Sequence, residues 1–450
     1  MLSKAMNKRI VCLAIPNIIT NITVPLLGMV DTAIVGHLNA DGQSADYIGA
    51  IAIGTMIFNI IYWNFGFLRM GTSGFTAQAY GAKDRTQQMS VLLRACFIAL
   101  TASLLLIVLQ KPIAALVFAF VENKNSAASL AADYFFIRIW AAPATLGIYA
   151  LKGWFIGMQD SKTPMWISIL INVLNIAFSF LLAIEYGMKV KGVALGTVIA
   201  QWGGFATTLL FWFVKYGSLR KYINLKHALS VKKLAEFFKV NADIFLRTLC
   251  LIAVTSYFTI ASSSMPYPLL AVNTLLMQLF TLFSYFMDGF AYASESLCGR
   301  YKGAKDYASL ASCVKHILLW GGVLSLLFTA VYFLWGENIL SILTDKAEVL
   351  AVCKDYKAWT LLIPLCGCVA FLYDGILIGM TETKIMRDAI FVATALFFVL
   401  FFSFKSSIGN NALWIGFLTY LSARSILMMW WSKKNLKYYV KDYEQSLFQL

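Results

Sequence analysis

One carboxylate, Asp31, lies inside a long apolar stretch near the start of the sequence. An ionisable side chain inside a membrane-spanning helix is costly, so such a residue is a functional candidate by default. No basic residue stands three or four positions away from it, and burial without a cationic partner favours the protonated form of a carboxylate. Asp31 is therefore a candidate proton carrier, with a carboxylate that bonds loop backbone as the structural alternative.

Other polar side chains fall at a similar depth in later apolar stretches. Counted from the expected outer ends of the fifth and sixth stretches, they lie in the outer half or near the midplane: Asn175, Ser179, Thr197 and Gln201. With Asp31 they could form one proton- or cation-coupling cluster, or they could serve as polar contacts between helices. Pro16 and Pro25 precede Asp31 in its own stretch, where they remove backbone hydrogen bonds and would permit the helix to bend.

A second set of charged residues lies toward the opposite ends of the stretches. Lys152 and Asp374 occupy equivalent positions in the two halves of the sequence. They could pair across the halves as a gate, or Lys152 could extend its ammonium group to the membrane surface. Further charged residues that could join such a gate are Arg69, Asp288 and Glu295. Asp243 and Arg247 stand one helical turn apart, which predicts an ion pair within one helix.

The elements that position these residues must be membrane-spanning helices. Hydrophobic residues make up 60% of the 450 residues and charged residues only 13%. Apolar stretches of about twenty residues, the length that crosses a bilayer, recur twelve times between residues 10 and 432. Their apolar runs are continuous rather than alternating, which excludes a β-barrel. The composition predicts an all-α membrane protein with twelve spans.

The basic residues give these spans a direction. Lysines and arginines concentrate in every second segment between the apolar stretches, most densely between 215 and 239. Cytoplasmic segments carry such an excess of positive charge, so we expect both termini in the cytoplasm. Membrane topology then explains the net charge of +15, and a nucleic-acid partner is not needed.

The sequence contains an internal repeat. Residues 81–84 (Gly-Ala-Lys-Asp) recur at 303–306, and Gly-Met at 157–158 recurs at 379–380, so both motifs share a spacing of 222 positions. Each half then holds six spans, and an even number gives both halves the same orientation. The prediction is two six-helix lobes related by a pseudo-twofold axis. Its ranges are a first lobe over 1–214, a basic cytoplasmic linker over 215–238, a second lobe over 239–432 and a cytoplasmic tail over 433–450.

Four segments carry a family resemblance. They are residues 67–81 (FLRMGTSGFTAQAYG), 153–164 (GWFIGMQDSKTP), 241–248 (NADIFLRT) and 374–379 (DGILIG), the last followed by Met386-Arg387-Asp388. These segments resemble the multidrug and toxic compound extrusion (MATE) family, in particular its branch of DNA-damage-inducible protein F. The resemblance covers essentially the whole chain.

The resemblance implies a twelve-helix, two-lobed antiporter of the bacterial inner membrane. Such a protein exports bulky, amphiphilic, often cationic small molecules by alternating access, driven by inward flow of protons or sodium ions. The resemblance also places a protonatable aspartate at Asp31. The family often has Asn followed by Asp four residues later in the fifth span, whereas this sequence has Asn175 and Ser179. That departure weakens any inference of a two-carboxylate site and leaves Asp31 as the main acid.

Other functions find less support in the residues. The sequence has no GxxxxGK[ST] phosphate-binding loop, no HExxH and no Cys/His cluster with metal-ligand spacing. We therefore expect no enzyme, no metal and no cofactor besides the coupling ion, H⁺ or possible Na⁺, and a monomer in the bilayer. Two alternatives stay open. One is a flippase for lipid-linked precursors, which a large basic cavity would favour, and the other is a membrane-embedded lipid-modifying enzyme, which would need sizeable loops.

Overall fold

The computed structural model describes residues 4–36, 44–119 and 126–447. In that part of the chain every regular element is helical, and twelve helical segments are long and apolar enough to cross a membrane. The predicted all-α membrane fold with twelve spans is confirmed. Residues 448–450, the end of the predicted cytoplasmic tail, lie outside the described residues.

The chain divides into two compact units. The N-unit is Ile19–Phe237, and the C-unit combines Met1–Ile18 with Phe238–Leu450. Helix α1 (Lys4–Gly36) therefore begins in the C-unit and ends in the N-unit. The sequence placed a boundary at nearly the same point, before residue 239, but it assigned the first eighteen residues to the other unit.

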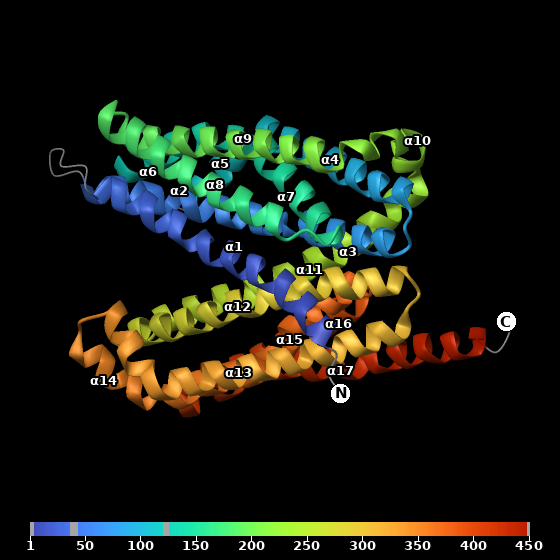
Figure 1. Ribbon diagram of the computed structural model, residues 1–450. Coiled ribbons are helices and arrows are strands. Elements are labelled where there is room, and N and C mark those ends of the chain that lie inside the picture. The colour runs from blue at the N-terminus through green and yellow to red at the C-terminus, as the bar shows by residue number, and fades with distance from the viewer. Residues whose placement is uncertain (1–3, 37–43, 120–125, 448–450) are drawn as a thin grey trace. The chain divides into compact units, whose positions relative to one another are not determined.

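Among its described residues, the N-unit contains nine complete α-helices besides the second part of α1 and the first turns of α11. Within it α8 and α9 run side by side, and α7 packs on α3 and α4 (Figure 1). The bounds of these nine helices are α2 (Ser44–Asn64), α3 (Gly66–Gly81), α4 (Arg85–Val108), α5 (Gln110–Ala119), α6 (Ser126–Arg138), α7 (Ala142–Gly157), α8 (Lys162–Phe180), α9 (Lys189–Tyr216) and α10 (Leu225–Ala228).

In its described part, the C-unit contains the first part of α1, the part of α11 that follows Phe237, and six further α-helices. The most extensive helix packing in this unit is between α12 and α15 and between α16 and α17, and α13 packs on α15. The bounds of these helices are α11 (Val231–Ser263), α12 (Leu269–Gly303), α13 (Tyr307–Leu343), α14 (Ala347–Asp355), α15 (Lys357–Gly379), α16 (Thr383–Ile408) and α17 (Asn410–Leu447).

The basic segment predicted as a linker packs on α4 of the N-unit. Arg94 of α4 is buried, and its Nε donates a hydrogen bond to the carbonyl oxygen of Ala228 at 2.6 Å. Ser90, one turn earlier on α4, is hydrogen-bonded to the ring of His227 at 3.0 Å. His227 and Ala228 of this segment are therefore held against the side of α4 by two side chains.

The internal repeat appears in the structure as two copies of the same helix corner. Lys83 and Lys305 both adopt a left-handed backbone, with φ of 57° and 56°. The next residue then caps the following helix in each half. The Asp84 carboxylate accepts the backbone N–H of Gln87 at 2.9 Å, and that of Asp306 accepts the N–H of Ser309 at 3.0 Å. The repeated motif is thus a corner whose aspartate starts a helix.

Glycines bring a second pair of equivalent helices into close contact. A Cβ atom built on Gly153 of α7 would overlap the carbonyl oxygen of Arg69 on α3. A Cβ atom on Gly375 of α15 would overlap that of Ala291 on α12. Both pairs keep the repeat spacing, so only a residue without a side chain allows these backbones to approach so closely in either unit.

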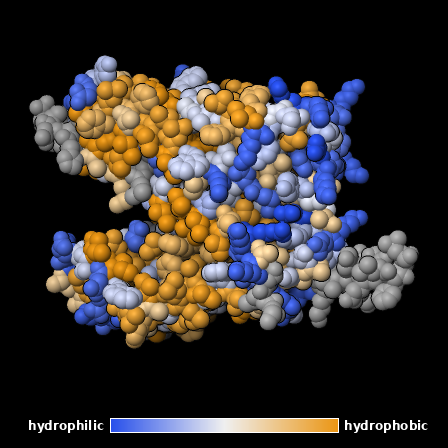
Figure 2. Space-filling view, viewed as in Figure 1, coloured by the Kyte–Doolittle hydropathy of each residue, from blue (hydrophilic) through white to orange (hydrophobic). Residues whose placement is uncertain are grey.

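Large apolar side chains remain exposed on the outward faces of the helices. On α4 they recur at Leu100, Leu104 and Val108, which are 54%, 51% and 74% exposed. Figure 2 shows broad hydrophobic areas over the helices, with hydrophilic residues gathered toward helix ends. A stripe of exposed apolar residues at helical spacing suits contact with lipid chains.

Candidate functional site

The Asp31 carboxylate is buried in the N-unit without a direct ionic partner. Its side chain lies near the end of α1, and the residue is 4% exposed. Its Oδ1 atom has no hydrogen-bond partner, and among the described residues no basic nitrogen lies within 4.0 Å of the carboxylate. The carboxylate is therefore neither in bulk solvent nor locked in an ion pair.

Two side chains from other helices act on Asp31. Ser179 of α8 is its neutral polar neighbour, and Arg138 in the last turn of α6 is the cation that attracts it. The Ser179 side chain is fully buried, and its Oγ atom has no hydrogen-bond partner within the described chain. The predicted neighbourhood of Asp31 and Ser179 is thus present, and it includes a cation that the sequence analysis did not single out.

Arg138 is held by aromatic rings. It donates a hydrogen bond from Nη1 to the hydroxyl oxygen of Tyr134 at 2.6 Å, and its guanidinium lies 4.8 Å from the centre of the Phe58 ring. Cation–π contact and a phenol acceptor stabilise the charge without a carboxylate. Asp31 was identified because it is an ionisable residue inside an apolar stretch, and the same rule applies to Arg138.

The other predicted polar residues extend this cluster along α8 and α9. Asn175, one turn from Ser179, donates from Nδ2 to the Thr197 hydroxyl at 2.9 Å, and the Thr197 hydroxyl donates to the carbonyl of Val193 at 3.0 Å. The Oδ1 atom of Asn175 has no partner within the described residues. Gln201, one turn beyond Thr197, is only half-buried and has no hydrogen bond there.

The structure therefore brings four of the five predicted residues into one buried cluster. Within it, the oxygen atoms that lack a hydrogen-bond partner come from Asp31, Asn175 and Ser179. Such atoms can accept a proton or face a small cation. The coupling role assigned to these residues stays a prediction.

The proline pair lies in a helix that stays continuous. Helix α1 runs from Lys4 to Gly36 through both Pro16 and Pro25. Its second part is fixed to α8, because Asn172 donates from Nδ2 to the carbonyl oxygen of Thr23 at 3.0 Å. Bending at the prolines is therefore a prediction about another state of the protein.

In the C-unit, Asp374 binds two arginines. Its Oδ2 atom accepts hydrogen bonds from Arg247 of α11 and from Arg424 of α17, the latter at 2.8 Å. All three residues are buried, and Arg424 is 1% exposed. Sequence reasoning missed Arg424, although it too is an arginine within an apolar stretch.

The predicted ion pair between Asp243 and Arg247 is wrong. Asp243 instead binds Arg387 of α16, with Nη1 and Oδ1 2.7 Å apart, and accepts a hydrogen bond from Thr383 at 2.9 Å. Four-residue spacing places two side chains on one face of a helix. Here contacts with neighbouring helices offer each charge a better partner than its own helix does.

The remaining charged residues named for a gate have contacts inside their own units. The ammonium group of Lys152 donates to the hydroxyl of Ser168 at 2.7 Å, and Arg69 lies close enough to act on its charge. Glu295 is buried in α12, and Asp288 on the same helix interacts with Tyr285. A gate formed by Lys152 and Asp374 stays a prediction, and Asp374 already has two cationic partners.

The two units thus hold their buried acids in different ways. Asp31 of the N-unit forms no ion pair with the described residues, whereas Asp374 of the C-unit is paired with two arginines. In both acids the Oδ1 atom lacks a hydrogen-bond partner in the described chain. The charge of Asp374 is balanced by its two arginines, whereas a buried carboxylate without an ion pair needs another partner to balance its charge. The N-unit cluster is therefore the candidate coupling site.

Comparison with known proteins agrees with this architecture. The family model MatE matches residues 16–181 and 244–403, which together exceed half of the chain. DNA damage-inducible protein F of Escherichia coli (strain K12) is 34% identical over 422 residues, which cover 92% of this chain and 89% of the relative. Multidrug resistance protein MdtK of Photorhabdus laumondii is 22% identical and covers 95% of this chain and 96% of its own.

A solved structure has the same fold. The crystal structure of MATE in the bent conformation aligns with a TM-score of 0.84 and 18% identity, and it covers 98% of this chain and 99% of its own. Members of the family are transporters and not enzymes. With two six-span halves, a family match across both and a relative at 34% identity, this chain belongs to the MatE family of multi-pass membrane transporters.

Proposed function

We propose that the protein is a secondary antiporter that exports amphiphilic, often cationic small molecules in exchange for protons by alternating access. Its place would be the bacterial inner membrane, with both termini in the cytoplasm. The observation that carries the proposal is the state of Asp31, which is 4% exposed and forms no ion pair with the described residues, whereas the equally buried Asp374 binds two arginines. The name of the relative MdtK, a multidrug resistance protein, supports the substrate class.

The position of Arg138 suggests how protonation would be coupled to movement. An ionised Asp31 on α1 is attracted to Arg138 on α6, although the two are not in an ion pair. A proton on Asp31 cancels that attraction, because the carboxyl group becomes neutral. Helix α1 is then free to move away from α6, and Pro16 and Pro25 supply the points at which it can bend.

The transport cycle follows from this coupling. A proton from outside neutralises Asp31, α1 bends, and the substrate leaves outward. The protein then turns inward, Asp31 releases its proton to the cytoplasm, and a new substrate binds. Each ligand can shift this equilibrium only by its differential affinity for the two states. Proton and substrate must therefore favour different arrangements of α1, so that binding of one weakens binding of the other.

Sodium is the second candidate for the coupling ion. The Oδ1 atom of Asn175 and the Oγ atom of Ser179 are buried without hydrogen-bond partners in the described chain, near the Asp31 carboxylate. A carboxylate together with neutral oxygens is a suitable environment for a hard cation. The proton is the first choice because an arginine lies close enough to Asp31 to disfavour a second cation.

Transport of a fluorescent cationic dye by protein in liposomes tests the proposal. A pH gradient and a sodium gradient are imposed in separate experiments, with wild type, Asp31→Asn and Asp31→Glu. We expect the pH gradient alone to drive dye movement in the wild type. Asp31→Asn should reduce this movement to the level of liposomes without protein, and Asp31→Glu should retain part of it.

Asp133→Asn is the matched control. Asp133 lies in the same unit on α6, but it is half-exposed and forms a surface ion pair with Lys191 at 3.2 Å. This variant should transport as the wild type does. Full pH-driven transport by Asp31→Asn would show that another group carries the proton, and movement driven by sodium alone would replace the proton with sodium as the coupling ion.

A further inference from the structure

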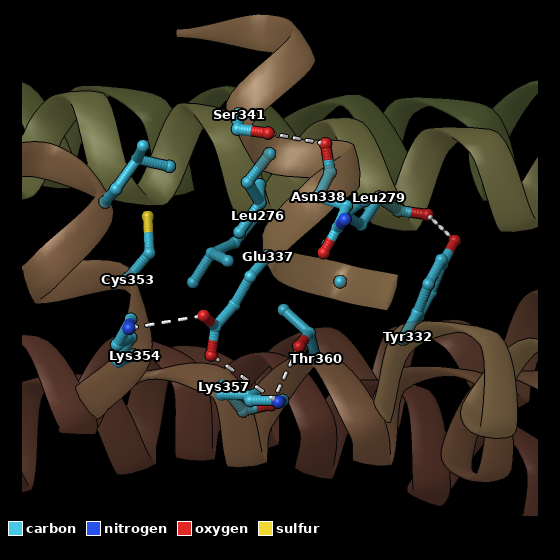
Figure 3. Close-up of a pocket in the computed structure, with 13 residues that line it drawn as sticks. Leu276, Leu279, Tyr332, Glu337, Asn338, Ser341, Cys353, Lys354, Lys357 and Thr360 are labelled. Carbon is cyan, nitrogen blue, oxygen red and sulfur yellow. Dashed lines mark hydrogen bonds and ion pairs between the residues drawn. The ribbon is translucent and has the colours of Figure 1, made fainter. Parts of the chain in front are cut away.

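A pocket opens in the C-unit where α13 ends, far along the chain from the Asp31 cluster. It lies between α12, α13, α14 and the start of α15 and has a volume of about 310 Å³ (Figure 3). Ligand pockets in proteins begin at about this size. The pocket is lined only by C-unit residues, and the proposed function makes no use of it.

The pocket has an apolar floor and a charged rim. Leu276 and Leu279 of α12 are buried in its floor, and Tyr332 of α13 turns its hydroxyl away to donate to the carbonyl of Leu279 at 2.6 Å. Figure 3 shows Glu337, Lys354 and Lys357 grouped on one side of this floor. An apolar base beneath a few charged groups suits an amphiphile.

The rim carries one more positive charge than negative. Glu337 binds one lysine with each carboxylate oxygen, since its Oε2 lies 3.2 Å from the ammonium of Lys354 and its Oε1 lies 3.8 Å from that of Lys357. Two ammonium groups against one carboxylate leave a net charge of +1. An anionic group at the rim would balance it and would accept hydrogen bonds from both lysines.

The surroundings place this rim at the edge of the lipid. Aromatic side chains stand beside it on the outside of α13, where Trp335 is 54% exposed and Phe333 lies under the ammonium group of Lys357 at 5.4 Å. Such belts of aromatic and lysine side chains mark the level of lipid head groups. The occupant can therefore enter from the bilayer and need not come from solution.

The thiol that lines the pocket is not poised to react. It belongs to Cys353 of α14, and burial raises its pKa to about 11. The thiolate, which is the nucleophile, is therefore scarce at neutral pH.

We propose that this pocket binds a phospholipid, with the phosphate between Lys354 and Lys357 and the first carbons of an acyl chain over Leu276 and Leu279. The volume accommodates a head group and part of a chain, and the remaining chain continues along the apolar outside of α13. In the orientation proposed above, the lipid comes from the outer leaflet. It would link α13 to α14 and α15 at the end of the C-unit.

Gly336 provides a way to fill the pocket without touching its charges. It lines the pocket and is buried, yet a Cβ atom built on it would meet no atom within 4 Å. Gly336→Leu therefore extends a side chain into the cavity while it raises the helix propensity of α13. Gly322→Leu is the matched control, because Gly322 lies on the same helix, also faces open space and does not line the pocket.

A second variant removes the proposed phosphate contacts. In Lys354→Gln/Lys357→Gln, both ammonium groups are lost, and each is partly exposed, at 61% and 33% of its side chain, so the fold should persist. Lys191→Gln is the control, because Lys191 is also a half-exposed lysine in a surface ion pair, but in the N-unit.

The probe is dioctanoyl phosphatidylglycerol, titrated into delipidated, purified protein and counted by native mass spectrometry. We expect one tightly bound lipid in the wild type. In the double lysine variant binding should weaken about thirtyfold, because two lysines are lost and each contributes about 1 kcal/mol near a lipid surface. In Gly336→Leu binding should weaken by about tenfold or more, because the leucine side chain fills the cavity. Gly322→Leu and Lys191→Gln should bind as the wild type does.

Two further probes separate the possible sources of the ligand. Dioctanoyl glycerol, which lacks the phosphate, should bind no better to the wild type than to the double lysine variant. Inorganic phosphate should not displace the lipid at equal concentration. Wild-type affinity in both pocket variants would overturn the proposal, and so would displacement by inorganic phosphate, which would assign the rim to a soluble anion.

Discussion

Replacing Asp374 by asparagine should destabilise the C-unit severely. The residue is 4% exposed, and its Oδ2 atom accepts hydrogen bonds from Arg247 and Arg424, which are buried as well. Asparagine keeps the shape of the side chain but removes its charge, so two guanidinium groups would share a buried site without a counter-charge. Removing one partner of a buried ion pair costs roughly 3–5 kcal/mol. Because one substitution leaves two cations unpaired, we expect a loss of stability at the upper end of this range, about 5 kcal/mol.

Replacing Arg424 by methionine should cost much less, although Arg424 is the most deeply buried of the three. The Asp374–Arg247 pair that remains is electrically neutral. What is lost is the second hydrogen bond and a contact with the Tyr420 ring, whose centre is 5.3 Å from the guanidinium carbon. We expect a loss of roughly 1–2 kcal/mol from these contacts. The double variant Asp374→Asn/Arg424→Met leaves only one cation, Arg247, without a counter-charge. Its stability should therefore lie between those of the two single variants.

The assay is unfolding of the purified protein in one detergent, followed by tryptophan fluorescence, with midpoints compared at a fixed scan rate because membrane proteins often unfold irreversibly. The expected order of stability is wild type, Arg424→Met, the double variant and Asp374→Asn. Asp133→Asn, which breaks a half-exposed surface pair, is the control and should cost less than about 1 kcal/mol. Equal losses for the two single variants, or a double variant weaker than Asp374→Asn, would refute the charge argument.

Three further changes test the packing and the ion pairs. Gly375→Ala should lower the stability of the protein by about 1–3 kcal/mol or more, and with it the yield of folded protein, because the added Cβ atom overlaps the backbone of α12. Gly322→Ala should be tolerated, because a Cβ atom there meets no atom within 4 Å. Asp306→Ala should cost about 1 kcal/mol in the unfolding assay because α13 loses its cap. Arg387→Met should cost about 2 kcal/mol by the same measurement because buried Asp243 keeps only its threonine partner.

The sequence predicted the larger framework because the signals for it are local. Whether a stretch of about twenty residues crosses a membrane depends on its own composition, so twelve spans could be counted before any packing was known. The repeat was equally visible, since residues 81–84 and 303–306 make the same turn and the same aspartate cap in both units. An isolated acid in an apolar stretch, Asp31, could be found in the same way.

Tertiary structure decided which charges meet. Four-residue spacing suggested that Arg247 binds Asp243, but Arg247 binds Asp374, a residue 127 positions away. A spacing rule describes one helix, whereas the energy of a buried charge depends on the helices packed around it. Arg138 and Arg424 could have been noted from the sequence as intramembrane charges, but their partners could not.

What the sequence determined by itself is therefore the membrane fold, the two-fold repetition of its parts and the presence of an acid deep in the first span. Only the tertiary structure decided that Asp31 forms no ion pair with the described residues while Asp374 binds two arginines, that the first turns of α1 belong to the C-unit, and that a pocket lies at the end of α13. The physical reason is range. Hydropathy and capping act within one helix, whereas ion pairing and cavities arise where helices distant in sequence pack together.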